Sequence, residues 1–337
     1  MKRLPLVIAL AALCAGLALA GSATAAAKSR YDRVLKSPAG REKLAKIAKM
    51  EESARFDPAL AKELAADREA LVRARCAEAL GRIGDPAGVP YLARLASDGN
   101  AIVAATAAYS LGLVGDTLAL EPLRKCLTST SKTVKMRAIE ALGKTGKKGA
   151  APIIAPLLRH FDGAVRSQAA LALAFAGDSA AARELDAIVY DPDPRVASCA
   201  AYAIGRLGYK AKIDEVAALL SSDNAEVRLR AAEALGRLKA AGAVPSIAPL
   251  VKDRDRWIAL RAAEALGRIG SSRAADELAK ILVSHDPYLK TVALRGLAAA
   301  GEKSHFDSVK PLLDDPSPMV RRAALEAAAK ADRGRAR

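Results

Sequence analysis

Apolar residues recur along this chain with a fixed period of about 31 residues, which is within the range that repeat architectures use. The segment Val227–Leu238, VRLRAAEALGRL, has close copies at Val72–Gly84 and Ile258–Gly270. When the leading aliphatic residues are aligned, nine positions follow one another at this interval: Val72, Val103, Val134, Val165, Val196, Val227, Ile258, Leu289 and Val320. Self-similarity at a fixed period of this length indicates an array of stacked structural repeats.

Each copy has the spacing of an amphipathic helix. Counted from the leading aliphatic residue as zero, offsets +4, +7, +8 and +11 are almost all apolar and share one helical face. A capping residue lies three residues before it, and proline follows in Asp193-Pro194, Asp286-Pro287 and Ser317-Pro318. The other capping candidates are Asn100, Asp162, Asn224 and Asp255. Glycine at offset +12 is predicted to end the helix, at Gly84, Gly115, Gly146, Gly177, Gly208, Gly270 and Gly301.

A second glycine recurs inside the helix at offset +9. It occupies Gly81, Gly112, Gly143, Gly205, Gly236 and Gly267. Glycine within a helix costs about 1 kcal/mol relative to alanine, so its repetition in register requires an offsetting gain. We therefore expect the neighbouring helix to approach closely at this offset.

A second apolar pattern with helical spacing lies between successive copies. Proline often opens it, as in Pro90–Ala96, Pro152–Leu158 and Pro245–Val251. Each repeat is therefore predicted to be helix–turn–helix, and essentially no strand is expected because no stretch alternates with period two. Neither helix buries its apolar face alone, so neighbouring repeats must stack.

The repeats resemble HEAT repeats, in the short form that is similar to phycobilisome lyase HEAT-like repeats. The matching residues are the VRxRAAEALGRIGD-type segment, of which Val72–Asp85 is the closest copy, and the proline-led helix after it. The resemblance covers about residues 57–333. It implies an all-α fold, a right-handed α-solenoid of about nine 31-residue helix-turn-helix repeats. Such arrays mostly serve as binding scaffolds, so function has to be argued from a site.

The resemblance leaves the ends of the chain outside the array. We expect an N-terminal linker and capping helix over residues 26–56, with the charged segment Arg41–Ala54 as the helix. The array then extends over 57–333, and its ninth copy, which loses both glycines, ends in a basic tail over 334–337. An atypical terminal repeat of this kind is typical of a capping unit.

Residues 1–25 have the features of a secretory signal peptide. Lys2 and Arg3 precede an apolar run that ends at Leu19, and Ala23-Thr24-Ala25 is a small-residue cleavage pattern. The alternative is an uncleaved anchor helix, because the uncharged run from Leu4 onward is long enough to span a bilayer of about 30 Å. Cleavage would give an exported protein, periplasmic or extracellular, with no membrane span.

Composition adds a basic balance and few aromatic residues. The formal net charge is +16 and aromatic residues make up 4% of the chain. The excess of Lys and Arg favours acidic partners or simply solvates a helical surface. The mature chain keeps Cys76, Cys126 and Cys199 at unrelated offsets, which argues against a disulfide framework. Cys76 and Cys126 are interpreted as small buried hydrophobic residues.

No residue set in the chain predicts catalysis, a metal site or a cofactor. His160, His285 and His305 fall in or beside turns, and no metal-binding or phosphate-binding motif accompanies them. Asp191 and Asp193 are interpreted as a turn plus a helix cap, with a calcium site as the alternative. The resemblance to lyase repeats names a chromophore-attachment enzyme, but no residues in this chain carry that activity over.

The candidate binding site lies on a stripe at offsets +3, +6 and +10, which is the concave face in a HEAT array. In the first, third, sixth and seventh repeats this stripe is charged and is predicted to pair along its own helix. In the second, fourth and fifth repeats it is more apolar: Thr106-Tyr109-Leu113, Gln168-Leu171-Phe175 and Cys199-Tyr202-Arg206. Apolar groups at solvent-facing offsets indicate a contact site, with burial between neighbouring helices as the alternative. The same question attaches to Trp257 and Tyr288 at the starts of their helices.

We expect a partner-binding patch about 30 Å long, spread over stacked second helices about 8–10 Å apart. Its apolar members are Tyr109, Leu113, Leu171, Phe175 and Tyr202, and its charged border is Arg137, Lys144 and Arg206. The predicted function is an exported, non-catalytic, monomeric scaffold that binds a protein or peptide, favouring an acidic one. The alternative is an enzyme or enzyme subunit of the phycobilin-lyase type. Nucleic acid is disfavoured because Glu alternates with Arg along the stripe.

Overall fold

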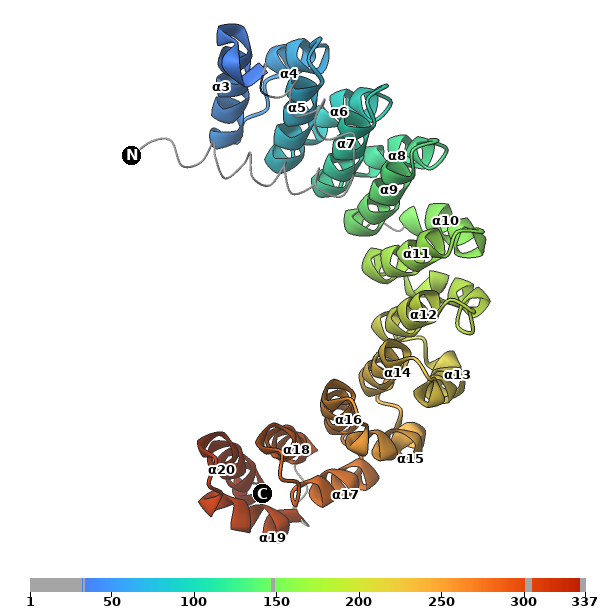
Figure 1. Cartoon of the computed structure of the whole chain (residues 1–337), viewed down its shortest axis with the longest axis vertical. Helices are drawn as coiled ribbons and strands as arrows, with labels where there is room; N and C mark the ends of the chain where they lie inside the picture. The colour runs from blue at the N-terminus through green and yellow to red at the C-terminus, as the bar shows by residue number, and fades with distance from the viewer. Residues whose placement is uncertain (1–31, 33, 147–148, 301–304, 334–337) are drawn as a thin grey trace. The chain divides into compact units, whose positions relative to one another are not determined.

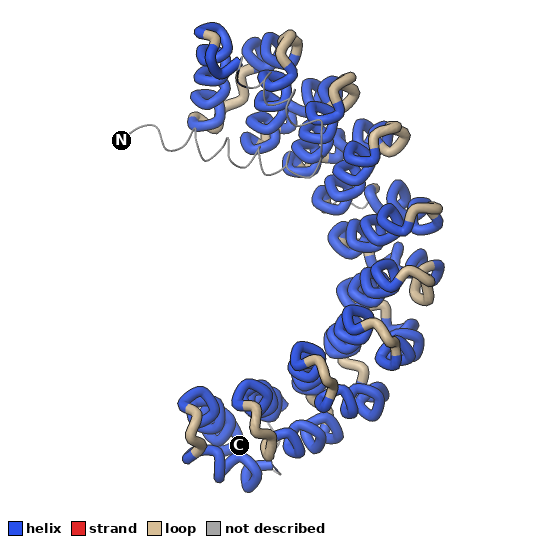
Figure 2. Tube along the Cα trace, viewed as in Figure 1, coloured by secondary structure: helices blue, strands red, loops and turns tan. Residues whose placement is uncertain are grey.

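The computed structural model describes residues 32, 34–146, 149–300 and 305–333, with side chains described as far as Lys330. The predicted signal peptide (1–25) and basic tail (334–337) lie outside the described residues. Within the described ranges the chain is helical, and Figure 2 shows helices joined by short loops without a strand. The predicted all-α solenoid fold is confirmed. In these same ranges, every helix is too short or too polar to cross a membrane.

The chain divides into two compact units, Met1–Ala138 and Ile139–Arg337, and the boundary falls within the second helix of the third repeat. Each repeat has a first helical segment, a turn and a longer second helix (Figure 1). The first unit and the boundary helix contain α3 (Pro38–Glu52), α4 (Pro58–Ala65), α5 (Ala70–Ile83), η1 (Pro86–Gly88), α6 (Val89–Leu95), α7 (Ala101–Val114), η2 (Thr117–Ala119), α8 (Leu120–Cys126) and α9 (Lys132–Thr145).

The second unit continues the pattern from the fourth repeat to the ninth. Its first helical segments are α10 (Ala150–Ile154) with η3 (Ala155–Arg159), η4 (Ser179–Ala187), η5 (Lys210–Lys212) with α13 (Ile213–Ala218) and η6 (Leu219–Ser221), η7 (Ala241–Ala243) with α15 (Val244–Ile247) and η8 (Ala248–Lys252), α17 (Ser272–Ile281), and α19 (Phe306–Val309) with η10 (Lys310–Asp314). Its second helices are α11 (Gly163–Ala176), α12 (Pro194–Leu207), α14 (Ala225–Leu238), α16 (Arg256–Ile269), α18 (Pro287–Ala300) and α20 (Pro318–Arg333). Consecutive second helices of this unit pack against one another.

Two helix boundaries differ in detail from the prediction. The N-terminal helix was expected over Arg41–Ala54, but α3 begins at Pro38, because the Ser37 hydroxyl caps the Gly40 N–H and proline suits the first turn. It ends at Glu52, and Ala54 takes a φ of 49°. The apolar segment Pro152–Leu158 is likewise not one α-helix: η3 begins at Ala155 because Pro156 has no N–H to donate to the preceding turn.

Six of the predicted caps of the second helices are confirmed: Asn100, Asp162, Asp193, Asn224, Asp255 and Asp286. Asn100 and Asn224 each accept hydrogen bonds from two backbone N–H groups at the start of their helices, and Asp162, Asp193 and Asp255 accept one each. Six of the predicted terminating glycines adopt a left-handed φ, while Gly301 lies outside the described residues: Gly84, Gly115, Gly146, Gly177, Gly208 and Gly270. The sixth repeat places Lys239 at this offset, and its φ of 52° shows that the turn is kept without glycine.

The glycines at offset +9 mark the closest contacts between second helices. A Cβ atom added to Gly205 would lie 2.6 Å from the Cα of Ala234, and one added to Gly236 would lie 2.8 Å from the Cα of Ala265. Each glycine faces the residue at offset +7 of the next repeat, which is itself small. The prediction of close helix approach is confirmed, and backbone packed on backbone offsets the helix cost of glycine.

A ladder of ion pairs joins the turns of successive repeats. Arg228, at offset +1, donates to both carboxylate oxygens of Asp253 at 3.0 and 3.3 Å, and also to the carbonyl oxygens of Ser222 and Asp223. Burial opposes ionisation of Asp253, but hydrogen bonds from the Asp255 N–H and from Arg228 lower its pKa below the usual range. The same pair, at the same separation along the sequence, is formed by Arg73 and Asp98, Arg166 and Asp191, and Lys290 and Asp315.

Most repeats without one of these ion pairs have small residues at both positions. They have alanine at offset +1 and serine at the position of the aspartate: Ala104 and Ser129, Ala197 and Ser222, and Ala259 and Ser284. The third repeat has Lys135 and His160 at the two positions. The residue at offset +1 and the residue at the aspartate position therefore vary together from repeat to repeat.

The cysteine thiols of the described residues are free, and two of them belong to the core. Cys76 and Cys126 are buried in the first unit, and burial raises the pKa of their thiols to about 12 and about 11. Their interpretation as small buried hydrophobic residues is confirmed. Cys199, in the second unit, is half-buried. Thiols that stay protonated at neutral pH are poor nucleophiles, so Cys76 and Cys126 serve packing.

Candidate functional site

The candidate site is built on the second-helix face, the surface formed by offsets +3, +6 and +10 of the second helices. In the second unit it is most apolar on α11, where Leu171 and Phe175 stand one helical turn apart. Leu171 is half-buried, whereas the Phe175 side chain is 51% exposed. Because the core offsets of α11 already face the stack, Phe175 is left with one side open to solvent.

Arg206 of α12 covers part of the Phe175 ring. Its guanidinium carbon lies 4.6 Å from the ring centroid, which is a cation–π arrangement. The Arg206 Nε donates to the carbonyl oxygen of Ala174 at 2.9 Å, one of the carbonyls that the end of α11 leaves without a helical partner. The hydrogen bond to this backbone carbonyl therefore fixes the Arg206 side chain, and Arg206 in turn restricts the Phe175 ring.

Tyr202 extends the same surface toward α14. Its ring is half-buried, and the guanidinium groups of Arg230 and Arg237 lie 5.4 and 5.8 Å from its centroid. Both arginines also bind Glu233, at 3.3 and 2.9 Å. The structure thus brings Leu171, Phe175, Tyr202 and Arg206 together within one unit, framed by arginines of the next repeat.

The remaining predicted residues divide between the units. Tyr109, Leu113 and Arg137 belong to the first unit, where the Arg137 guanidinium carbon lies 5.5 Å from the half-buried Tyr109 ring and Leu113 is 43% exposed. Lys144 belongs to the second unit and pairs with Glu140 at 2.9 Å. A single patch across both units stays a prediction. Burial between helices, the alternative interpretation, holds in part for both tyrosines and for Leu171.

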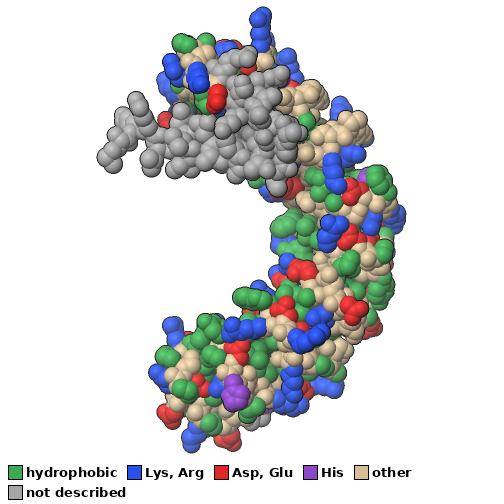
Figure 3. Space-filling view, viewed as in Figure 1, with side chains coloured by type: hydrophobic (Ala, Val, Ile, Leu, Met, Phe, Trp, Pro, Cys, Tyr) green, Lys and Arg blue, Asp and Glu red, His purple; other side chains and the backbone are tan. Residues whose placement is uncertain are grey.

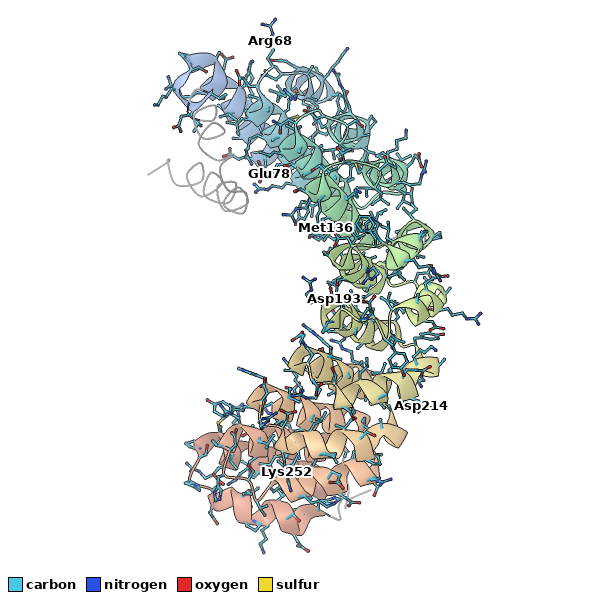
Figure 4. The ribbon with its side chains drawn as sticks, turned by 45° about the vertical axis from the view of Figure 1, so that its right-hand side comes forward. Arg68, Glu78, Met136, Asp193, Asp214 and Lys252 are labelled. Atoms are coloured by element: carbon cyan, nitrogen blue, oxygen red, sulfur yellow. The ribbon has the colours of Figure 1, made fainter. Side chains whose placement is uncertain are left out.

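The charged stripes pair along their own helices, as predicted. In the first repeat Glu78 pairs with both Arg75 and Arg82, and Figure 4 shows Glu78 on α5, away from exposed Arg68 in the preceding turn. In the seventh repeat Arg261 binds Glu264 at 2.7 Å. Opposite charges three or four residues apart on one helix contribute about 0.2–0.5 kcal/mol per pair, so these pairs stabilise the fold only slightly.

The acidic residues considered for calcium have other roles. Asp191 binds Arg166 through both carboxylate oxygens, and Asp193 caps α12 at its start and binds Arg195. The interpretation as a turn plus a helix cap is confirmed. Among the described residues no cluster of His, Cys, Asp and Glu has an arrangement that holds a metal ion.

Two histidines also have structural contacts. His160 accepts a hydrogen bond from the Asp162 N–H at Nδ1, at 3.0 Å, and its ring stacks on Phe161. His305 is buried, and its Nε2 lies 2.9 Å from a carboxylate oxygen of Asp276. Each contact belongs to a turn or a packed helix start.

Sequence reasoning missed Arg230 and Arg237 as members of the aromatic surface. A signal was present, because Tyr109 and Tyr202 at offset +6 are each followed by an arginine at offset +3 of the next repeat. Analysis of one helix at a time pairs Arg230 with Glu233 only. The contact with Tyr202 requires the register between neighbouring helices, which the glycine contacts set.

A family model described as HEAT repeats matches the chain in overlapping segments. They cover residues 58–143, 120–205, 150–226, 213–298 and 275–336. No curated protein matches the chain.

Solved structures include similar helical repeat arrays. An engineered protein is 21% identical over 89% of this chain and 97% of its own, with a TM-score of 0.54, a likeness that shows the shared fold. The complex of CpcE and CpcF of phycocyanin lyase from Nostoc sp. is 21% identical, over 72% of this chain and 94% of its own, with a TM-score of 0.44. YIBA of E. coli is 19% identical, over 84% of this chain and 95% of its own, with a TM-score of 0.48.

Proposed function

The chain belongs to the HEAT repeat family, and from this premise we propose that it is a non-catalytic scaffold that binds a protein or peptide on its second-helix face. HEAT repeats commonly mediate protein interactions. The observation that carries the proposal is Phe175, a large apolar side chain half-exposed at an offset that most other repeats fill with Arg or Lys. Exposed aromatic residues that neighbours hold in place are typical anchors of protein interfaces.

The surroundings of Phe175 favour an acidic partner. Arg206 lies on the ring and binds a backbone carbonyl, so it is not neutralised by a carboxylate there. An incoming Asp or Glu side chain would meet an exposed guanidinium beside an apolar ring and could form charge-assisted hydrogen bonds with it. Charge also speeds encounter with acidic partners, given a formal net charge of +16.

The binding test compares aromatic residues with a charged residue on the same face. Once a partner is captured from envelope extract with the mature protein, Phe175→Ala and Tyr109→Ala are each expected to weaken binding by about 2 kcal/mol, because interface energy concentrates in aromatic anchors. Glu326→Ala, an exposed charged residue at offset +6 of α20, is the control, and isothermal titration calorimetry measures the difference. Phe175 is half-exposed, so its variant should keep the unfolding midpoint of the wild type. Full binding by both aromatic variants would leave these rings a packing role only.

We also propose that the scaffold is exported. The basis is the Lys2-Arg3 pair, the apolar run to Leu19 and the Ala23-Thr24-Ala25 pattern. N-terminal sequencing of the protein expressed in a bacterial host with a periplasm is expected to show a start near Ala26. Soluble cytosolic protein that retains Met1 would contradict export.

A further inference from the structure

Three large apolar side chains are exposed at one offset in the last three repeats. Trp257, Tyr288 and Met319 each directly precede the leading aliphatic residue of their helix and are 68%, 52% and 37% exposed. Trp257 and Tyr288 are thus too exposed to be explained by packing at the helix entry. Because α16 packs against α18 and α18 against α20, the three side chains form a row across neighbouring repeats.

A groove of 160 Å³ follows this row, and we call it the tryptophan groove. Its lining residues are Trp257, Leu260, Arg261, Glu264, Tyr288, Thr291, Val292, Arg295 and Met319. Leu260 and Val292 are half-buried and Thr291 is buried, so the groove has an apolar base beneath exposed aromatic and sulfur-containing side chains. Its volume suits one or two side chains rather than a folded domain.

The helix starts that carry the two aromatic residues are capped, and the Tyr288 ring is also covered by an arginine. The backbone N–H groups of Trp257 and Tyr288 each donate to a capping aspartate at 2.8 Å. Arg256 lies 4.7 Å from the centroid of the Tyr288 ring and is fixed by two hydrogen bonds to Asp286, at 2.7 and 2.9 Å. Side chains that are ordered before binding lose less conformational entropy when a ligand arrives.

One basic side chain of the groove, that of Arg295, is available to bind a ligand. Arg261 is paired with Glu264 at 2.7 Å, whereas Arg295 is exposed, and no described residue forms an ion pair or hydrogen bond with its side chain. Figure 3 shows Lys and Arg side chains interspersed with apolar ones over these C-terminal repeats. A guanidinium without an ion-pair partner among the described residues, beside an apolar base, matches a carboxylate that it can bind through two hydrogen bonds.

From these observations we propose that the tryptophan groove binds a partner peptide that carries an aromatic or branched aliphatic side chain next to Asp or Glu. The apolar side chain enters the groove between Trp257 and Met319, and the carboxylate binds Arg295. This site lies on α16, α18 and α20 and is separate from the surface around Phe175, so it extends the proposed function to a second contact. A hollow the size of a side chain favours a peptide over a lipid surface, which takes up protruding groups.

Trp257 is the single tryptophan of the chain, so its fluorescence reports on this groove directly. The full chain is titrated with short acidic peptides that carry one phenylalanine, leucine or isoleucine. Matched peptides have alanine in place of the apolar residue, or lysine in place of the acidic residues. At least one acidic apolar peptide is expected to shift the Trp257 emission to shorter wavelength in a saturable manner. The alanine and lysine peptides are expected to bind at least about tenfold more weakly.

Variants distinguish this groove from the surface around Phe175. Tyr288→Ala and Arg295→Glu are each expected to weaken binding at least about tenfold, and added salt to weaken it further. Phe175→Ala, on the other surface, is expected to leave the affinity for these peptides unchanged. It is expected to weaken binding of the protein or peptide partner that contacts the surface around Phe175. All these residues are exposed, and thermal unfolding verifies that each variant folds.

Several outcomes would overturn the proposal. These are no saturable shift with any acidic peptide, equal binding of the lysine peptides, or unchanged affinity in Arg295→Glu. A shift produced by anionic phosphatidylglycerol vesicles or by single-stranded DNA, but not by the peptides, would assign the groove to a lipid surface or to nucleic acid instead. A shift that depends only on the concentration of this protein would assign it to a second copy of the chain.

Discussion

Replacing Gly236 by leucine is expected to lower the free energy of unfolding by about 3 kcal/mol. Even a Cβ atom at this position would lie 2.8 Å from the Cα and 3.0 Å from the Cβ of Ala265. Leucine adds a branched side chain to a contact made by backbone, which cannot rotate away, so α14 and α16 must separate. Urea denaturation followed by circular dichroism measures the loss.

Gly242→Leu is the matched control, because this glycine is exposed in η7 and has no atom within 4 Å of its added Cβ. Its free energy of unfolding is expected to stay within about 0.5 kcal/mol of the wild type. If Gly236→Leu kept both the midpoint and the slope of the wild type, the glycines at offset +9 would not set the helix spacing.

The second large effect concerns the ion-pair ladder. Arg228→Ala is expected to lower the free energy of unfolding by about 3 kcal/mol. The Asp253 side chain is only 9% exposed, and the change removes its guanidinium partner. Asp253→Ser should cost a similar amount, because Arg228 then keeps only the carbonyl oxygens of Ser222 and Asp223. Chemical denaturation of the single and double variants measures the coupling.

The double variant reproduces the alanine and serine found naturally at Ala197 and Ser222. We expect it to be more stable than the sum of the single losses predicts, by more than about 1 kcal/mol. Arg124→Ala, which breaks an exposed pair with Glu121, is the control and should leave the free energy of unfolding close to that of the wild type. Strict additivity of the two changes at Arg228 and Asp253 would show that the matched residues do not act together.

Much of this fold could be predicted from the sequence because each repeat contains residues that mark where its second helix begins and ends. The fixed period located the second helices, the capping residues and glycines gave their ends, and the glycine at offset +9 indicated the close contact. The first helical segments were less predictable. Prolines such as Pro156 start a helix in one context and interrupt it in another, and only packing on the second helices decides between the two.

The candidate site was predictable by position but not by contact. Offsets +3, +6 and +10 identified Phe175 and Tyr202, because departures from a repeating pattern are visible in the sequence. The arginines that cover these rings come from the next repeat, so their placement depends on the register between helices. Trp257 and Tyr288 were visible too, but their exposure depends on how tightly each helix start packs against its neighbour.

The ladder also restricts how such a chain can be shortened or recombined. A deletion of one whole period that joins Ala197 to the repeat beginning near Asp253 would set alanine against a buried aspartate, although the reading frame of the array is kept. A deletion of two periods that joins Arg166 to the same aspartate would preserve the match. The repeats are therefore not interchangeable modules, because each repeat contacts the repeat before it and the repeat after it through one of these two positions. A rearranged array is expected to fold well only where each new contact pairs Arg or Lys with Asp, or Ala with Ser.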